Sequence, residues 1–288
     1  HLDHVHIRPP LRNSKSAKTL ILVKWRHPPG HPPPLADRLP PRLDAPAARA
    51  ALECITLLKN RDDVLPLTSR GPIFVSGPTA HSLNALNGGW SGTWQGTDPA
   101  YNNPGRATAL EAMQEEFGAG RIAYEALETM FFTESDIDRV VRAVRSSKPE
   151  VAVLFLGEMP YTELVGNIGD LRLADNQLDL VRAVKATDTP VVAGFVEGRP
   201  RTFPQVEPLL DGVVMAYLPG DFGGQAIAQV LSGAHNPSGR LPFTWPLEGS
   251  SHVTYDRKNT ENVGVDFEMD AFQPQYAFGS GLSYSPVV

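Results

Sequence analysis

The sequence lacks long apolar runs and has one cysteine. No run of about 18 apolar residues occurs, the length that a spanning helix needs, so we expect no membrane segment. The apolar stretch "TLILV" is too short for the core of a signal peptide. The single cysteine, Cys54, excludes an internal disulfide and any zinc site built on several cysteines. Its place in "RAALECITLLKN" predicts a packed apolar residue.

Several short motifs of common enzyme classes are also missing. There is no G-x-x-x-x-G-K-[ST] phosphate loop, no G-x-S-x-G elbow and no H-E-x-x-H zinc motif. The first apolar strand runs into "SGPTAHS" rather than into G-x-G-x-x-G. Nucleotide-binding and serine-hydrolase functions are therefore unsupported.

The net charge of −6 hides a basic N-terminal segment. Residues 1–44 hold eight Lys or Arg against three acids, nine of the 27 prolines and five of the eight histidines. These charges lie among prolines without interleaved aromatics, which argues against nucleic acid. We interpret 1–44 as an irregular tail, a linker or an artificially joined sequence. We expect no metal site there, because no carboxylate or cysteine completes a ligand spacing.

From residue 45 onward, apolar runs alternate with helical patterns. Strands without polar alternation, separated by helices, are typical of a mostly parallel sheet covered on both faces. The sequence thus predicts a three-layer α/β sandwich over 45–288, with an irregular tail after 233 that adds at most one edge strand. The predicted strands are 71–77, 121–126, 150–157, 189–198 and 211–220, and the predicted helices are 45–60, 106–118, 133–147, 174–187 and 223–233.

Three carboxylates follow the strand predicted at 150–157, in the loop "GEMPYTELVGNIGDL". Ligands of open α/β sheets bind at the carboxyl ends of the strands. Glu158, Glu163 and Asp170 are therefore expected at the functional edge of the sheet. Two interpretations stay open: the loop is polar because it meets water, or it holds a carboxylate over a ligand.

A second loop, "LNGGWSGTWQG" at 86–96, places Trp90 and Trp94 among glycines. Helix packing cannot hold these rings, so each either packs against the domain or offers a flat face to a ligand. Aromatic faces pack well against the C–H faces of sugar rings. We favour packing for Trp90 and ligand contact for Trp94, which precedes Gln95 and Gly96.

At this point the sequence resembles glycoside hydrolase family 3, the β-glucosidases and exo-β-glucanases. Seven blocks carry the resemblance, in order, over residues 45–288: "ARAALECITLLKN" with "VLPL", "GGWSGTWQG", "GEMPYTELVGN", "EGRP", "LPGDFGGQAIAQVLSG", "NPSGRLPFTWP" and "AFGSGLSY". Each block alone is weak evidence for the resemblance, but seven blocks in the family's order make it specific. The likeness is greatest to the exo-glucan hydrolase branch, where G-E-x-P-Y-T-E and G-G-W-x-x-x-W-Q-G occur together.

The resemblance implies a TIM-like barrel paired with an (α/β)6 sandwich, with the active site between them. In the family the barrel supplies a nucleophilic aspartate, and the sandwich supplies an acid/base glutamate and a stacking tryptophan. These last two match Glu163 and Trp94. A retaining glycosidase needs such a pair of carboxyl groups, about 5–5.5 Å apart.

We favour Glu163 over its rival Glu158 as acid/base. Glu163 lies beside Tyr161, and partly apolar surroundings raise the pKa of a carboxyl. Glu158, at the strand end, is expected with Tyr161 and Trp90 among the residues that contact substrate. Asp170 is expected to brace the loop, and Asn167 stands where the branch often has an acid.

The 288 residues leave no room for a family 3 barrel, so we expect the nucleophile outside this chain. The chain is then a fragment, one of two polypeptides, or a sugar-binding derivative. Two functions stay open. One is part of a retaining β-glucosidase or exo-β-glucanase that removes terminal β-D-glucosyl residues. The other is a non-catalytic carbohydrate-binding or structural module.

The expected partners are a β-glucoside or β-glucan oligosaccharide and a barrel domain in cis or in trans. We expect no metal, cofactor, nucleic acid or membrane, and the resemblance implies a periplasmic or secreted protein. Half of an enzyme should expose an apolar patch around Trp90, Trp94 and Tyr161. A chain that works alone should be polar or self-associated there.

Overall fold

One six-stranded sheet organises the part of the chain that the computed structural model describes, residues 44–250 and 274–285. Its strand order is β1-β6-β5-β4-β2-β3. All neighbours are parallel except β1, which is antiparallel to β6 at one edge. The strands are β1 (Thr56–Asn60), β2 (Ile73–Ser76), β3 (Ile122–Tyr124), β4 (Val151–Gly157), β5 (Val191–Val196) and β6 (Gly212–Met215).

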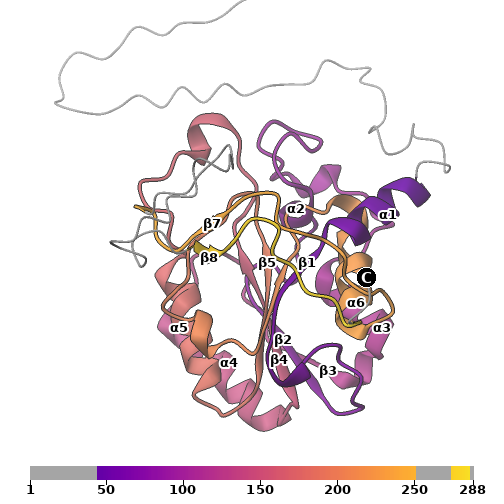
Figure 1. The fold of residues 1–288 in the computed structure, drawn as a ribbon, viewed down its shortest axis with the longest axis vertical. Coiled ribbons are helices and arrows are strands. Elements are labelled where there is room, and N and C mark those ends of the chain that lie inside the picture. The colour runs from indigo at the N-terminus through magenta and orange to yellow at the C-terminus, as the bar shows by residue number, and fades with distance from the viewer. Residues whose placement is uncertain (1–43, 251–273, 286–288) are drawn as a thin grey trace, which may run out of the picture. The chain divides into compact units, whose positions relative to one another are not determined.

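Helices cover both faces of this sheet (Figure 1). Helices α1, α2, α3 and α6 contribute to one apolar core, and α4 and α5 to the other. The helices are α1 (Asp44–Cys54), α2 (Leu83–Asn87), α3 (Ala109–Phe117), α4 (Glu134–Ser147), α5 (Asp175–Lys185) and α6 (Gly223–Ser232). Six 3-10 turns connect them: η3 (Arg61–Asp63), η4 (Pro99–Tyr101), η5 (Ala119–Arg121), η6 (Glu163–Gly166), η7 (Glu207–Leu209) and η8 (Gly220–Phe222). The predicted three-layer α/β fold is confirmed.

Strand β4 shows why the apolar runs carry no polar alternation. Successive side chains of a strand point to opposite faces of the sheet. Val153 and Phe155 enter the core under α3 and α6, whereas Leu154 and Leu156 enter the core under α4 and α5. Every residue of β4 is buried, as a central parallel strand covered on both sides requires.

The helix predicted over 45–60 is wrong in its last third. It ends at Cys54, and Thr56–Asn60 forms the edge strand β1. A short apolar run fits helix and strand equally by periodicity, and here pairing with β6 decides. The side chain of Cys54 is partly buried against the core, as predicted.

The C-terminal tail is mostly irregular where it is described. It contains one small antiparallel pair, β7 (Trp245–Pro246) with β8 (Pro274–Tyr276). The N–H of Leu282 also donates to the carbonyl of Leu57, which adds one bridge to the outer edge of β1.

Residues 1–43 lie outside the described residues, and so do the five histidines of that segment. None of the helices in the described ranges has the length and apolar character that crossing a membrane requires.

We expect Leu154→Ala to lower the free energy of unfolding by about 2–5 kcal/mol, because it leaves a cavity in a core that is closed on both sides. Leu164→Ala is the matched control, since Leu164 is 80% exposed and its truncation should cost less than about 0.5 kcal/mol. Urea unfolding of both variants measures the difference. Equal effects would contradict the assignment of the core.

Candidate active-site edge

The order of strands reverses between β2 and β4. After β2 the chain passes to α2 and α3 on one face, and after β4 it passes to α5 on the other. The two connections separate at the carboxyl ends of the strands, which is where open α/β sheets bind ligands. Both loops singled out in the sequence belong to these connections: 86–96 follows α2, and 157–171 follows β4 directly.

A buried glutamine fixes the start of the carboxylate loop, which we define as residues 157–171. Gln177 of α5 accepts the N–H of Gly157 and donates to its carbonyl, both at 2.9 Å. Gly157 has φ of +130°, and a Cβ there would lie 2.1 Å from the carbonyl oxygen of Val196. Only glycine fits this turn, so β4 ends here.

A second amide joins the carboxylate loop to the tryptophan loop, residues 86–96. The side chain of Gln95 accepts the N–H of Thr162 at 2.9 Å and donates to its carbonyl at 3.2 Å. The Thr162 hydroxyl donates to the carbonyl of Trp94 at 3.1 Å. Gly89 permits the close approach, because a Cβ would lie 2.3 Å from the methyl group of Thr162. The two loops thus form one connected edge.

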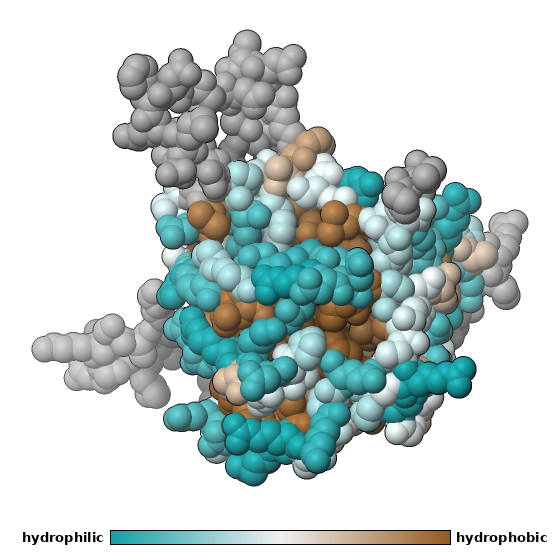
Figure 2. All heavy atoms as spheres, turned by 60° about the horizontal axis from the view of Figure 1, so that its bottom comes forward, coloured by the Kyte–Doolittle hydropathy of each residue, from teal (hydrophilic) through white to brown (hydrophobic). Residues whose placement is uncertain are grey.

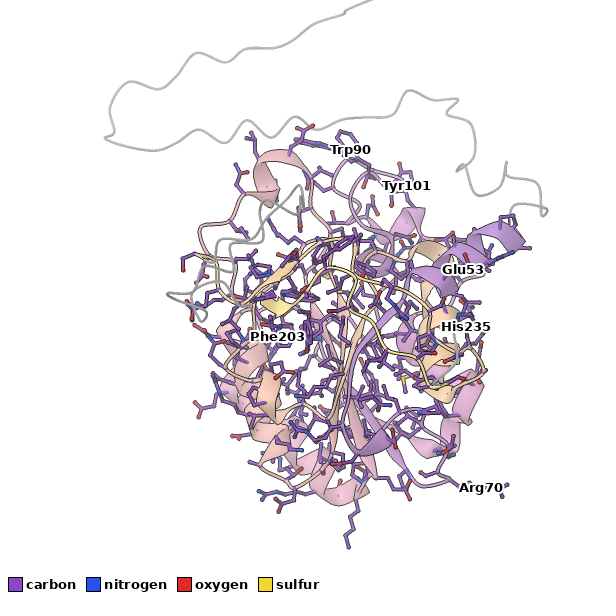
Figure 3. The ribbon with its side chains drawn as sticks, in the orientation of Figure 1. Glu53, Arg70, Trp90, Tyr101, Phe203 and His235 are labelled. Carbon is purple, nitrogen blue, oxygen red and sulfur yellow. The ribbon has the colours of Figure 1, made fainter. Side chains whose placement is uncertain are left out.

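Both tryptophans are exposed at this edge. Trp90 is 66% and Trp94 51% exposed, and their ring centroids lie 6.5 Å apart. Figure 3 places Trp90 at the end of the sheet opposite Arg70, with Tyr101 nearby. The expected packing of Trp90 against the domain is therefore wrong, since most of its surface is exposed.

An open hollow of about 360 Å³ lies between the loops. Trp90 and Gly89 line it from one loop, and Tyr161, Glu163 and Asn167 line it from the other. Trp94 lies next to Trp90, outside the lining itself. The structure therefore brings Glu163, Tyr161 and Trp90 together around one concave surface.

Glu163 is exposed and has an unusual backbone conformation. Its φ is +51°, in the left-handed region that costs a non-glycine residue roughly 1–2 kcal/mol. Among the described residues, no hydrogen bond or ion pair holds its carboxylate. Its neighbours along the chain, Leu164 and Val165, are exposed as well, whereas Trp90 and Tyr161 line the same hollow as Glu163.

Glu158 is held by cations instead. Its carboxylate is 13% exposed and accepts from Nε of Arg199 at 3.0 Å, with Nε of Arg201 3.5 Å away. The guanidinium of Arg199 lies 4.0 Å from the centre of the Tyr161 ring. Burial, with the nearby charge of Glu158, raises the pKa of Tyr161 to about 12, so the phenol stays neutral.

Asp170 lies on the far side of the carboxylate loop. Its carboxylate accepts the N–H of Arg172 at 2.9 Å and Nε of the same residue at 2.8 Å. It braces the turn and takes no part in the hollow. In the part of the chain that the structure describes, no three His, Cys, Asp or Glu side chains are grouped so that they could hold a metal ion.

Comparison with known proteins decides the family. The model of the glycosyl hydrolase family 3 C-terminal domain matches residues 55–284. The chain belongs to this family. The family 3 domain is 38% identical to lysosomal beta glucosidase of Dictyostelium discoideum over 248 residues, covering 83% of this chain and 29% of that protein. It is 30% identical to periplasmic beta-glucosidase of Salmonella typhimurium, covering 83% of this chain and 34% of that protein.

Solved structures agree with this assignment. Beta-glucosidase of Listeria innocua in complex with isofagomine superposes with a TM-score of 0.70 at 27% identity, over 87% of this chain and 35% of that one. Exo-1,3/1,4-beta-glucanase of Pseudoalteromonas superposes with a TM-score of 0.64 at 27% identity, over 86% and 38%. The chain thus spans about a third of the length of the proteins that it matches.

Sequence reasoning missed three side chains that hold the carboxylate loop. Gln177, Gln95 and Arg199 lie 20, 67 and 41 residues from their partners in the carboxylate loop. Only Gln95 and Arg199 lie in blocks that carry the resemblance, "WQG" and "EGRP". Neither block indicates which residue its side chain contacts.

A buried carboxyl, Glu197, lies beneath the site at the end of β5. One of its oxygens accepts the N–H of Arg201 at 3.0 Å, and the other has no partner within the described ranges. Burial raises the pKa of Glu197 well above its ordinary value, and the charge of Glu158 adds to this.

We expect Glu197 to make the stability of the wild-type domain fall with rising pH. The unfolded carboxyl ionises near its ordinary pKa of 4.5, while the folded one stays protonated, so stability is lost between 4.5 and the raised folded pKa. Glu197→Gln removes the ionisable group. The difference in free energy of unfolding between this variant and the wild type should therefore shift in favour of the variant as the pH rises through that window. Urea unfolding from about pH 4 to about pH 8 measures it, with exposed Glu128→Gln as control. A difference independent of pH would contradict the buried neutral carboxyl.

Proposed function

We propose that this domain is part of a retaining β-glucosidase or exo-β-glucanase that hydrolyses terminal β-D-glucosyl residues. The observation that carries the proposal is the exposed Glu163, on a strained backbone beside the exposed rings of Trp90 and Trp94. Strained residues gather at functional sites, where the surrounding structure maintains them. The names of the relatives, beta-glucosidases and an exo-beta-glucanase, agree with this reaction.

In this proposal the barrel aspartate attacks the anomeric carbon as the glycosidic C–O bond breaks. Glu163 gives its proton to the leaving oxygen, so the aglycone departs as a neutral alcohol. Glu163 then takes a proton from water, whose oxygen bonds to the anomeric carbon and releases the aspartate. Trp94 and Trp90 offer flat faces to the sugar in the leaving position, and Tyr161 forms the wall of the hollow.

The exposed apolar side chains of this edge support a covering barrel domain. Of the nine large hydrophobic side chains that are exposed in the described residues, six lie on the connections that follow β2, β4 and β6: Trp90, Trp94, Leu164, Val165, Ile168 and Leu218. Figure 2 turns the opposite end forward, where hydrophilic residues project and hydrophobic ones lie between them. An apolar edge of this kind is typical of a surface that meets a partner.

We expect turnover of an aryl β-glucoside when the 288-residue chain is mixed with a separately produced family 3 barrel. Glu163→Gln should lower kcat/KM for a poor leaving group by about 10²–10⁴-fold, because the general acid is lost. Glu53→Gln, an exposed change on α1, is the matched control and should have no effect.

Two results would contradict this assignment. Turnover by the chain alone, abolished in Glu163→Gln, would place a nucleophile inside the chain. Binding of glucosides that is lost in Trp94→Ala, without turnover in the mixture, would make the domain a non-catalytic sugar-binding module.

We also expect Leu164→Glu to weaken association with the barrel by about tenfold or more, because it buries a charge in the interface. Arg70→Glu is the control: Arg70 is exposed and lies at the end of the sheet opposite Trp90 (Figure 3). Sedimentation velocity or calorimetry measures both affinities. An equal loss in both variants would place the interface elsewhere.

A further inference from the structure

We propose that Arg199 is a positioning residue, which holds the segment 158–166 closed and so fixes the direction of Glu163. The inference rests on the proposed function of Glu163. No contact of its own fixes the Glu163 carboxylate among the described residues. The direction of that side chain therefore depends on the backbone that carries it.

Arg199 contacts this segment at its beginning, its middle and its end. Its Nε donates to the carboxylate of Glu158, at 3.0 and 3.2 Å from the two oxygens. Its guanidinium lies over the ring of Tyr161, 4.0 Å from the centroid. Its Nη1 donates to the carbonyl of Gly166 at 2.6 Å. Glu163 lies between the second contact and the third.

Arginine suits this position better than lysine. Its planar guanidinium donates in two directions at once and stacks on an aromatic ring, whereas an ammonium group is a point charge on a flexible stem. The charged partner is largely withdrawn from water, since only 13% of the Glu158 side chain is exposed, and charge-assisted hydrogen bonds are stronger there. Lysine would keep the attraction to Glu158 and lose the simultaneous contact with Gly166.

The loop that carries Arg199 is itself anchored. The indole N–H of Trp245, which is fully buried, donates to the carbonyl of Arg201 at 3.1 Å. The N–H of Leu173 donates to the carbonyl of Thr202 at 2.8 Å, and the N–H of Thr202 donates to the carbonyl of Leu171 at 3.0 Å. Arg199 therefore reaches from an anchored loop to the segment 158–166, and it adds contacts on both sides of Thr162, which Gln95 holds.

Hydrogen exchange of the 288-residue chain tests the positioning without any activity. Arg199→Ala should speed amide exchange in peptides from 158–168 by at least about tenfold, since three contacts are lost. Peptides from β4 and β5 should exchange as in the wild type. Arg199→Lys should give an intermediate rate, and it remains informative if the alanine variant unfolds. Arg172→Ala, which removes an exposed ion pair of the same loop, is the control and should leave 158–166 unchanged.

The leaving-group dependence of hydrolysis tests the link to Glu163. In the chain combined with its barrel, Arg199→Ala should lower kcat/KM for phenyl or alkyl β-glucosides by about a hundredfold, because a displaced acid delivers its proton poorly. For a dinitrophenyl β-glucoside, whose phenolate departs unprotonated, the loss in the glycosylation step should stay below about threefold. A purely structural role predicts equal losses for both substrates.

Each outcome decides one of the two proposals. Unchanged exchange in 158–168 for both Arg199 variants overturns the positioning role, whatever the activity. Faster exchange with equal losses for both leaving groups overturns the link to Glu163. If the wild-type combination has no turnover at all, the proposed function fails, and the exchange result still decides whether Arg199 holds the loop.

Discussion

The reversal of strand order between β2 and β4 is the constraint on which the rest of this domain depends. It sends the two connections to opposite faces of the sheet and opens a crevice at the carboxyl edge. Strand β4 supplies no side chain at its own end, because it ends at Gly157. Two glutamines hold the loops at this edge by pairing with backbone groups: Gln177 of α5 with Gly157, and Gln95 with Thr162.

Charged side chains add to the contacts that the two glutamines make. Glu158, Glu197, Arg199 and Arg201 form a compact group at the ends of β4 and β5, and Glu197 stays neutral because it is buried. The two guanidinium groups then carry more positive charge than Glu158 alone balances. Arg199 also donates a hydrogen bond to the carbonyl of Gly166, and Arg201 donates one to the carbonyl of Asp170. Both carbonyls belong to the carboxylate loop. The two arginines thus orient the loop backbone as well as neutralising Glu158.

The sequence predicts elements whose signal is local and misses what depends on distant partners. Strands 150–157 and 189–198 are recognisable because a central parallel strand is apolar throughout, and β4 and β5 lie there. Strand β1 is missed because its helical or extended state is decided by β6, about 150 residues further along the chain. For the site, resemblance marks Glu163 and Trp94. The exposure of Trp90 and the contacts of Arg199 follow from loop geometry that no local pattern encodes.

A general acid must hold its proton at the working pH, and proteins achieve this by burying a carboxyl or by placing a second carboxylate beside it. Glu163 is exposed in this domain, and the charge of Glu158 is already matched by two arginines. On the proposed function, burial and the second carboxylate have to come from the surface that covers the loops. The same covering would remove Leu164, Val165 and the tryptophan faces from water. The free energy gained by burying that apolar edge then offsets the cost of desolvating the acid, so docking and activation become one event.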